Sequence, residues 1–415
     1  MEHGPNDLSY FATTNARATH RLFGIRQRDR LSHVYVIGKT GVGKSSLLEV
    51  LARQDLAAGR GFALIDPHGD LVDELAQALP AQLADRVVYL NAPDPEQPFG
   101  YNPLRRVRED KIPLAASGLI ETLKKMWPDA WGVRMEHVLR NSLYALLERE
   151  GSVLPDLLRL YADKTFRGEV TSRVRNATVR RFWTDEFKHY PDRYRAEAVA
   201  PIQNKLGALL SDPTLYRILV APKVDLRFRA LMEEGGVLLV NLAKGRLGDE
   251  SSSVLGGILV STIGLAALSR ADQPPDARRP FFLFVDEFQT FTTLSFVNMM
   301  SELRKYGLGL TLAHQHLHQL DPDIRSAVLG NAGTLVSFRV GAEDTSILAR
   351  EFQPTFGAED LLNLPNRHIY LRLMIDGAPS RPFSAEVCAL GGAIDADAGR
   401  AEPTATQSSR LWEYR

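Results

Sequence analysis

Residues 38–45, GKTGVGKS, place a lysine and a serine directly after a glycine-containing loop. Every fixed position of the phosphate-binding pattern G-x-x-x-x-G-K-[ST] is present. Glycines let backbone N–H groups curl around phosphate oxygens, and a helix that begins at the loop adds a partial positive charge. We therefore expect Lys44 to contact the β- and γ-phosphates of a nucleotide and Ser45 to hold Mg²⁺. The expected nucleotide contacts are Gly38, Lys39, Thr40, Gly41, Val42, Gly43, Lys44, Ser45 and Ser46.

Two adjacent carboxylates follow the apolar run 281–285, FFLFV. Such a run predicts a strand buried on both faces, and ligands of open α/β sheets bind at the carboxyl ends of the strands. Asp286 is expected to hold Mg²⁺, and Glu287 to polarise the attacking water. An exposed acidic pair at a strand end is the structural alternative, but the accompanying phosphate-binding pattern favours the catalytic role.

A glutamine stands at the end of a third apolar run, 308–313. At the tip of a strand beside the Mg²⁺ strand, Gln315 could hydrogen-bond the γ-phosphate or the attacking water and so report whether the phosphate is present. Four histidines lie in these regions, and we do not expect them to form a metal site; the last three alternate with other residues and suit loop or strand-end positions. These histidines are His33, His314, His316 and His318.

A basic pair, Arg304 and Lys305, precedes Gly307. Cations in the last turn of a helix are favourable for the helix dipole, which is a purely structural role. The functional alternative is that Arg304 is an arginine finger, presented to the nucleotide of the next subunit. The sequence favours neither role over the other, and Arg339 is a weaker second candidate for the finger.

The elements that must position these residues are visible around the first motif. Residues 33–37, HVYVI, are typical of a buried strand. Residues 46–59, SLLEVLARQDLAAG, have the apolar spacing of a helix that stops at Gly59. A strand, a glycine-containing loop and a helix form the context that the phosphate-binding pattern requires.

The composition of the 415-residue chain limits its class. Hydrophobic residues make up 44% and charged residues 24%, as in ordinary globular proteins. Because the formal net charge is zero, contact with nucleic acid must come from a local basic patch or from a surface made by several subunits. The single cysteine, Cys388, excludes an intrachain disulfide and fits a reducing compartment.

The N-terminal residues 1–24 lack the apolar segment of a secretory signal. The longest nearly apolar run, 254–268, is shorter than a bilayer requires. We therefore expect a buried core helix there, no transmembrane segment, and a cytoplasmic protein that is free or peripheral at the inner face of the membrane.

Six stretches together resemble the motor domain of the HerA/FtsK group of P-loop ATPases, above all the type IV secretion coupling proteins of the TraG/TraD type. They are FGIRQRDRLSHVYVIGKTGVGKSSLL, ALIDPHGDLVDELA, VVYLNAPDPEQPFGYNPL, FFLFVDEFQTF, SELRKYGLGLTLAHQ and AVLGNAGTLVSFRVGAED. The resemblance covers most of residues 21–390, and DPHGD at 66–70 is characteristic of the group.

This resemblance implies an α/β fold, a RecA-like P-loop NTPase core with a mostly parallel central sheet plus an inserted all-α domain. It also implies ATP and Mg²⁺ as cofactors, hexameric rings and DNA pulled through a central pore. By resemblance, Lys44 and Ser45 take the phosphate and Mg²⁺ positions, Asp286 and Glu287 the Mg²⁺ and water positions, and Gln315 and Arg304 the sensor and finger positions. Coupling proteins usually begin with transmembrane helices and HerA-type translocases with a β-barrel, and we expect neither in the short segment before His33.

The predicted organisation interrupts the α/β motor. An N-terminal arm, 1–30, precedes the first part of the motor, 31–104; an all-α insertion, 105–219, precedes the second part, 220–390; and 391–415 is a flexible tail. Within the insertion, 164–183 carries six basic residues and one acidic residue, with interleaved aromatics. Such a segment suits phosphate contacts and base stacking, although a solvated helix face is slightly favoured for it alone.

The expected function is therefore an ATP-driven DNA-translocating motor that works as a homo-hexamer. A HerA-like DNA-processing or defence-associated translocase, and a motor that delivers protein substrates to a secretion channel, are alternatives. Relaxase, secretion-channel proteins or a nuclease are the matching partners. A GTPase switch is disfavoured because NKLG at 204–207 has glycine where the guanine-reading motif needs aspartate.

Overall fold

The computed structural model describes residues 4–15 and 20–388. The chain divides into two units, the first formed by 1–91, 227–243 and 266–415, and the second by 92–226 and 244–265. The predicted insertion 105–219 lies inside the second unit, which starts earlier, ends later and takes in a further segment after the strand at 237–241. The predicted flexible tail lies outside the described residues.

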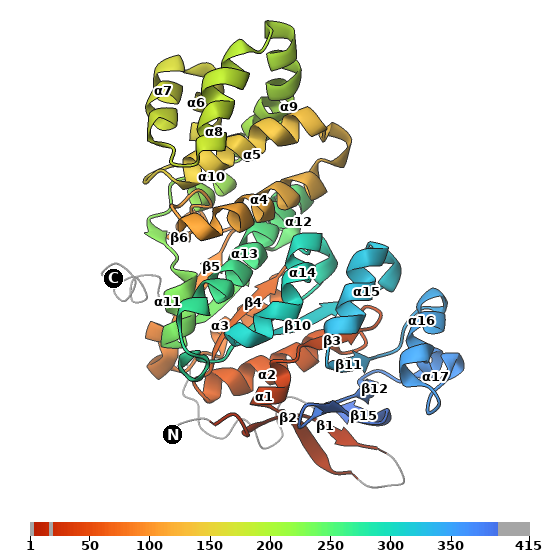
Figure 1. The fold of residues 1–415 in the computed structure, drawn as a ribbon. Coiled ribbons are helices and arrows are strands. Elements are labelled where there is room, and N and C mark those ends of the chain that lie inside the picture. Colours follow the sequence, from red (N-terminus) through yellow and green to blue (C-terminus); the bar gives the residue numbers. More distant parts are fainter. Residues whose placement is uncertain (1–3, 16–19, 389–415) are drawn as a thin grey trace. The chain divides into compact units, whose positions relative to one another are not determined.

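An eleven-stranded sheet forms the centre of the first unit (Figure 1). Seven neighbouring strands are parallel, and four antiparallel strands extend the sheet at one end. In spatial order the strands are β2 (Leu22–Arg26), β1 (Leu8–Thr14), β15 (Phe383–Val387), β12 (His368–Arg372), β11 (Thr334–Ser337), β3 (Val34–Ile37), β10 (Leu308–His314), β9 (Phe281–Val285), β4 (Gly61–Asp66), β8 (Val237–Asn241) and β5 (Val87–Asn91). The fold is thus the expected α/β core with a mostly parallel sheet.

The residues expected to form an N-terminal arm belong to this sheet. β1 pairs with β15 and β2 pairs with β1, both antiparallel. The short helix α1 (Gln27–Arg30) then leads into β3. Within the predicted arm 1–30, the described strands β1 and β2 therefore form the outermost strands of the motor sheet rather than part of a separate arm.

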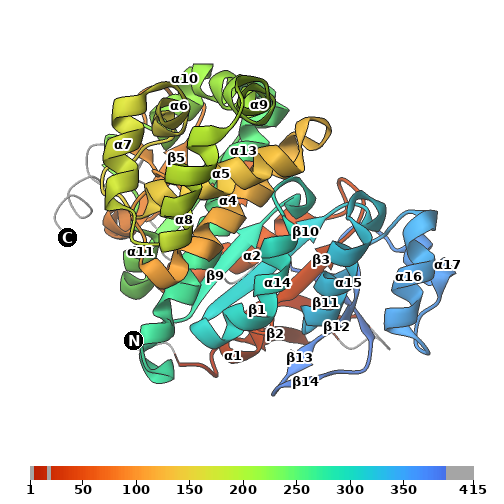
Figure 2. The ribbon, with the colours of Figure 1, turned by 45° about the horizontal axis from the view of Figure 1, so that its top comes forward.

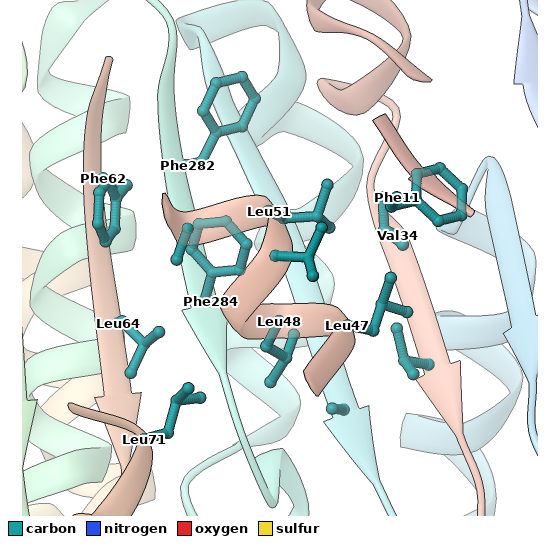
Figure 3. Close-up of a cluster of buried hydrophobic side chains, with 14 of the residues drawn as sticks. Phe11, Val34, Leu47, Leu48, Leu51, Phe62, Leu64, Leu71, Phe282 and Phe284 are labelled. Atoms are coloured by element: carbon teal, nitrogen blue, oxygen red, sulfur yellow. The ribbon is translucent and has the colours of Figure 1, made fainter. Parts of the chain in front are cut away.

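The helices of the first unit cover the two faces of the sheet. Figure 3 shows Leu48 and Leu51 of α2 in a buried cluster with Phe62 of β4 and Phe284 of β9, and Leu47 on the side of Val34 of β3. Side chains alternate across a strand, so every second residue of the central strands, such as Phe62 and Leu64, joins this core, and intervening residues such as Ala63 are buried on the opposite face. The helices are α2 (Lys44–Ala57), α3 (Asp70–Gln77), α11 (Phe228–Glu234), α14 (Leu294–Leu303), α15 (Pro322–Asn331), α16 (Ala342–Phe352) and α17 (Ala358–Asn363); the small hairpin β13 (Met374–Ile375) and β14 (Ala378–Pro379) completes the unit.

The second unit is mainly helical. Helix α5 contacts α4, α6, α8 and α9 and forms its centre (Figure 2). Asp163, Asn176 and Asp212 each accept backbone N–H bonds at the start of a helix, which is the usual role of an N-cap residue. The elements are β6 (Phe99–Gly100), α4 (Ile112–Met126), α5 (Val133–Leu147), α6 (Pro155–Ala162), α7 (Lys164–Arg173), α8 (Ala177–Arg181), α9 (Asp192–Ser211), α10 (Pro213–Leu219), β7 (Val224–Asp225), α12 (Lys244–Leu247) and α13 (Asp249–Ser269), whose last residues belong to the first unit.

The apolar run 254–268 forms most of α13, as expected. Together with the turn that follows it, this helix is long and apolar enough to cross a membrane, but 72% of its most apolar window is buried inside the protein. A core helix of a globular protein has the same properties, so the helix by itself does not indicate a membrane span.

Candidate nucleotide site

The phosphate-binding pattern lies between β3 and α2, as the sequence predicts. Gly41 and Gly43 adopt positive φ angles of 75° and 115°. Residues other than glycine rarely adopt such backbone angles. A Cβ atom on Gly38 would lie 2.5 Å from Cβ of Phe338, so only glycine fits this close approach. The local geometry therefore favours glycine at all three positions, two because of a positive φ angle and one because of a close approach, which argues against a chance glycine-rich turn.

Lys44 folds back onto its own loop. Its Nζ donates to the carbonyl oxygens of Gly38 and Lys39, at 2.6 Å and 2.9 Å, and the residue is only 7% exposed. Burial lowers the pKa of Lys44, while the carboxylates of Asp286 and Glu287 act in the opposite direction. The lysine is thus a partly desolvated cation that two backbone carbonyls hold in place near two acidic groups. The oxygens of a phosphate group could replace the two carbonyl oxygens as its partners.

Asp286 and Ser45 form the candidate Mg²⁺ position. Ser45 Oγ lies 3.3 Å from Asp286 Oδ2. Burial raises the pKa of Asp286 to about 6, and the neighbouring carboxylate of Asp66 adds to the rise. Two carboxylates in one desolvated site repel each other, and a hydroxyl and a carboxylate oxygen are hard ligands of the kind that Mg²⁺ prefers. The donor set therefore fits this cation.

Asp66 and His68 of the DPHGD stretch belong to the same site, and no role was predicted for either residue. Asp66 ends β4, and its carboxylate accepts N–H bonds from His68, Leu71 and Val72, at 2.8 Å, 2.9 Å and 3.3 Å. These bonds fix the turn that leads into α3. The signal in the sequence was the position of DPHGD at the end of an apolar strand, which is the same signal that identified Asp286.

Glu287 lies at the centre of a hydrogen-bonded chain. Its Oε1 accepts from Gln315 Nε2 and from His68 Nε2, the latter at 3.0 Å. Gln315 Oε1 in turn accepts from Thr40 Oγ1 of the phosphate loop at 2.8 Å. Glu287 has a left-handed backbone with φ 45°, a strained conformation for a residue with a side chain and one that is common at functional sites.

Three adjacent strands bring these groups together. β10 lies between β3 and β9, with Ile37 opposite His314 and Leu312 opposite Val285. The phosphate loop, Gln315 and the acidic pair therefore start at the same edge of the sheet, the edge where ligands of open α/β sheets bind.

The histidines have different roles. His314 is fully buried, and its Nδ1 lies 2.9 Å from the hydroxyl of Tyr35; burial lowers the pKa of His314 to about 3. His316 Nδ1 lies 3.5 Å from Asp344 Oδ2. Within residues 4–15 and 20–388, no cluster of three or more His, Cys, Asp or Glu residues could hold a metal ion.

The two finger candidates lie at opposite ends of the parallel strands, one before its strand and the other after it. Arg304 precedes β10, so the seven residues of that strand, which span about 20 Å, separate it from Gln315. Arg304 is exposed, lines a cavity of about 370 Å³, and has no ion-pair partner among the described residues. Arg339 follows β11 beside the phosphate loop, and its side chain is engaged by Leu364 O and Asn366 Oδ1 at 3.1 Å and 2.9 Å.

The basic segment 164–183 forms α7, α8 and the turn after them in the second unit. Its aromatic residues are buried: Phe166, Phe182 and Trp183 are 3%, 4% and 3% exposed. They are core residues and do not present faces for base stacking. Arg167 and Arg180 donate to backbone carbonyls, so only part of the basic charge is available for phosphate contacts.

Comparisons with known proteins show the family and the fold of this chain. The family model of the type IV secretion-system coupling protein DNA-binding domain matches residues 21–367. Among curated proteins no match was found.

Several solved structures share the fold. The plasmid coupling protein TrwB in complex with the non-hydrolysable ATP analogue ADPNP has a TM-score of 0.66 and 19% identity, over 97% of this chain and 100% of that chain. TrwB in complex with ADP and Mg²⁺ has a TM-score of 0.65 and 16% identity, over 97% and 99%. VirB4 of Thermoanaerobacter pseudethanolicus has a TM-score of 0.61 and 15% identity, over 93% and 98%. Because the family model covers most of the chain, this protein belongs to the family of the type IV secretion-system coupling protein DNA-binding domain.

Proposed function

We propose that this protein is an ATP-driven motor that moves DNA, as in conjugative type IV secretion. One observation carries the proposal: the phosphate loop, Asp286 and the Glu287–Gln315 pair converge at one edge of the sheet from three adjacent strands. Membership of the coupling protein family supports it. The similar fold of TrwB, which has been captured with ADPNP and with ADP and Mg²⁺, supports ATP and Mg²⁺ as the cofactors.

Each residue of the site has a chemical role in this proposal. Lys44 exchanges the carbonyl oxygens of Gly38 and Lys39 for the β- and γ-phosphate oxygens of ATP. Ser45 and Asp286 hold Mg²⁺, which when bound neutralises charge on the phosphates. Glu287 orients a water and accepts its proton as the water attacks the γ-phosphate, giving ADP and phosphate.

A ring arrangement accounts for Arg304. At the edge of the sheet opposite its own phosphate loop, this arginine cannot reach the nucleotide of its own subunit. A neighbouring subunit that presents its nucleotide to this edge would complete the site, as a finger in trans requires. We propose a homo-oligomeric ring, with a hexamer as the expected form, and prefer Arg304 to the engaged Arg339 as the finger.

DNA-stimulated ATP hydrolysis tests the function. We expect duplex or single-stranded DNA to raise the rate of phosphate release from wild-type protein, and the Lys44→Ala variant to stay at the background rate with either. If DNA does not change the rate of hydrolysis but a secreted protein substrate raises it, the proposed cargo is a protein and not DNA. The absence of any hydrolysis would refute the motor.

A further inference from the structure

One oxygen atom of the candidate general base has two donors that come from two different strands. Glu287 Oε1 accepts from Gln315 Nε2, at the end of β10, and from His68 Nε2, two residues beyond the end of β4. A carboxylate oxygen can only accept, so Nε2 of His68 carries a proton in this contact. The carboxylate is 9% exposed, whereas the His68 side chain is 45% exposed.

The two donors differ in what else they hold. Gln315 is joined to the phosphate loop through Thr40 Oγ1, at 2.8 Å. A glutamine that senses the γ-phosphate must turn at least part of its amide toward the nucleotide. Its hydrogen bond to Glu287 therefore depends on whether the phosphate loop holds a nucleotide with a γ-phosphate.

His68 is held independently of the phosphate loop. Its backbone N–H donates to Asp66 Oδ1 at 2.8 Å, and the other oxygen of Asp66 accepts from the first turn of α3. Gly69, which follows, has φ 95°, and a Cβ atom there would lie 2.5 Å from Oδ1 of Asn241 in β8. The turn that presents the imidazole is therefore specified by the neighbouring strands and by a glycine that no larger residue could replace without strain.

We propose that His68 is a positioning residue for ATP hydrolysis: it holds the carboxylate of Glu287 in place when Gln315 turns to the γ-phosphate. The inference rests on the proposed function. It assigns His68 no contact with the substrate, because the imidazole acts through Glu287. With one donor fewer, the Glu287 carboxylate would spend less time aligned with the attacking water, and the rate of the chemical step would fall without a change in nucleotide affinity.

The test compares His68→Ala, which removes the donor, with His68→Gln, which keeps an N–H donor on a side chain of similar reach. A hydrogen bond to a charged group contributes enough to predict a fall in kcat of about 10- to 100-fold for His68→Ala. KM and ATP-analogue affinity should change by less than about threefold, and His68→Gln should recover at least part of kcat. His318→Ala, at an exposed histidine beyond β10, is the matched control and should retain the wild-type rate.

A double-mutant cycle separates positioning from a general effect on the fold. In a Glu287→Ala background there is no carboxylate to hold, so His68→Ala should cost little further rate under single-turnover conditions. An equal loss of rate in both backgrounds, a loss of ATP affinity instead of kcat, or no recovery by His68→Gln would overturn the inference. Wild-type kcat in His68→Ala would overturn it while leaving the motor intact. A wild-type protein no more active than Lys44→Ala would refute the proposed function, and this inference with it.

Discussion

Ser45 and Asp286 are separated by 241 residues in the chain, yet Ser45 Oγ lies 3.3 Å from Asp286 Oδ2. The contact joins the first turn of α2 to the end of β9, across the intervening strand β10. A hydroxyl and a carboxylate that converge beside a phosphate loop are oxygen ligands of the kind that Mg²⁺ prefers, which is why we propose them as its holders.

Replacement of Lys44 by alanine should reduce ATP turnover to background, because the phosphates lose their cation. The lysine is buried and bonded to two carbonyls of its loop, so its position is constrained. Because the substitution removes side-chain atoms and adds none, we still expect the fold to persist. Circular dichroism and phosphate release check both points; turnover at the wild-type rate would contradict the assignment.

The Glu287→Gln variant should bind ATP and Mg²⁺ but hydrolyse ATP about 100- to 10,000-fold more slowly, because an amide cannot accept the proton of the attacking water. Asp286 remains available to Mg²⁺ in this variant. Binding of a fluorescent ATP analogue and turnover should be measured on the same preparation. Lost binding with normal turnover per bound nucleotide would show that the roles of the two acids are exchanged or wrong.

Arg304→Ala should lower the rate about 10³- to 10⁵-fold if the arginine is a finger in trans. Subunits with Arg304→Ala, when mixed with subunits carrying Lys44→Ala, should recover activity, because some interfaces then pair an intact Lys44 with an intact neighbouring Arg304. Arg339→Ala subunits mixed in the same way provide the comparison. If mixed rings demonstrably form and stay inactive, the trans role of Arg304 must be abandoned.

His33 should make the protein less stable in mild acid. Its Nδ1 accepts from Leu310 N–H at 3.1 Å and its Nε2 lies 2.9 Å from Met300 O, so the folded state holds the neutral ring. Burial lowers the pKa of His33 from 6.5 to about 4. Between these values the unfolded chain binds more protons than the folded protein, so stability falls as the pH falls, by about 2 kcal/mol between pH 7.5 and pH 5.

The matched variant for this prediction is His33→Asn, because asparagine does not titrate and tolerates the positive φ of 67° at this position. Urea unfolding at both pH values should show a smaller loss of stability on acidification for the variant than for the wild type. Equal losses in the two proteins would remove His33 as the cause.

The sequence alone determined the parts of the site that depend on short-range pattern. The run 281–285 could be recognised as a two-sided buried strand from its composition, and Asp286 and Glu287 as its polar end. The glycines before Lys44 indicated a turn whose backbone angles residues with a side chain rarely adopt. The structure confirms this, because Gly41 and Gly43 have positive φ angles. In each case the physical constraint acts within a few residues, so a single sequence carries it.

Only the tertiary structure decided which strand ends meet and which side chains are left free. His68 reaches Glu287 because β9 lies beside β4, and Phe182 and Trp183 are buried because several helices of the second unit enclose them. Likewise, strand β1 joins the sheet by pairing with β15, more than 350 residues further along the chain, and β2 extends it by pairing with β1. Periodicity in a sequence specifies which face of an element is apolar, but not its partner, because the choice among partners depends on packing and hydrogen bonding over the whole chain.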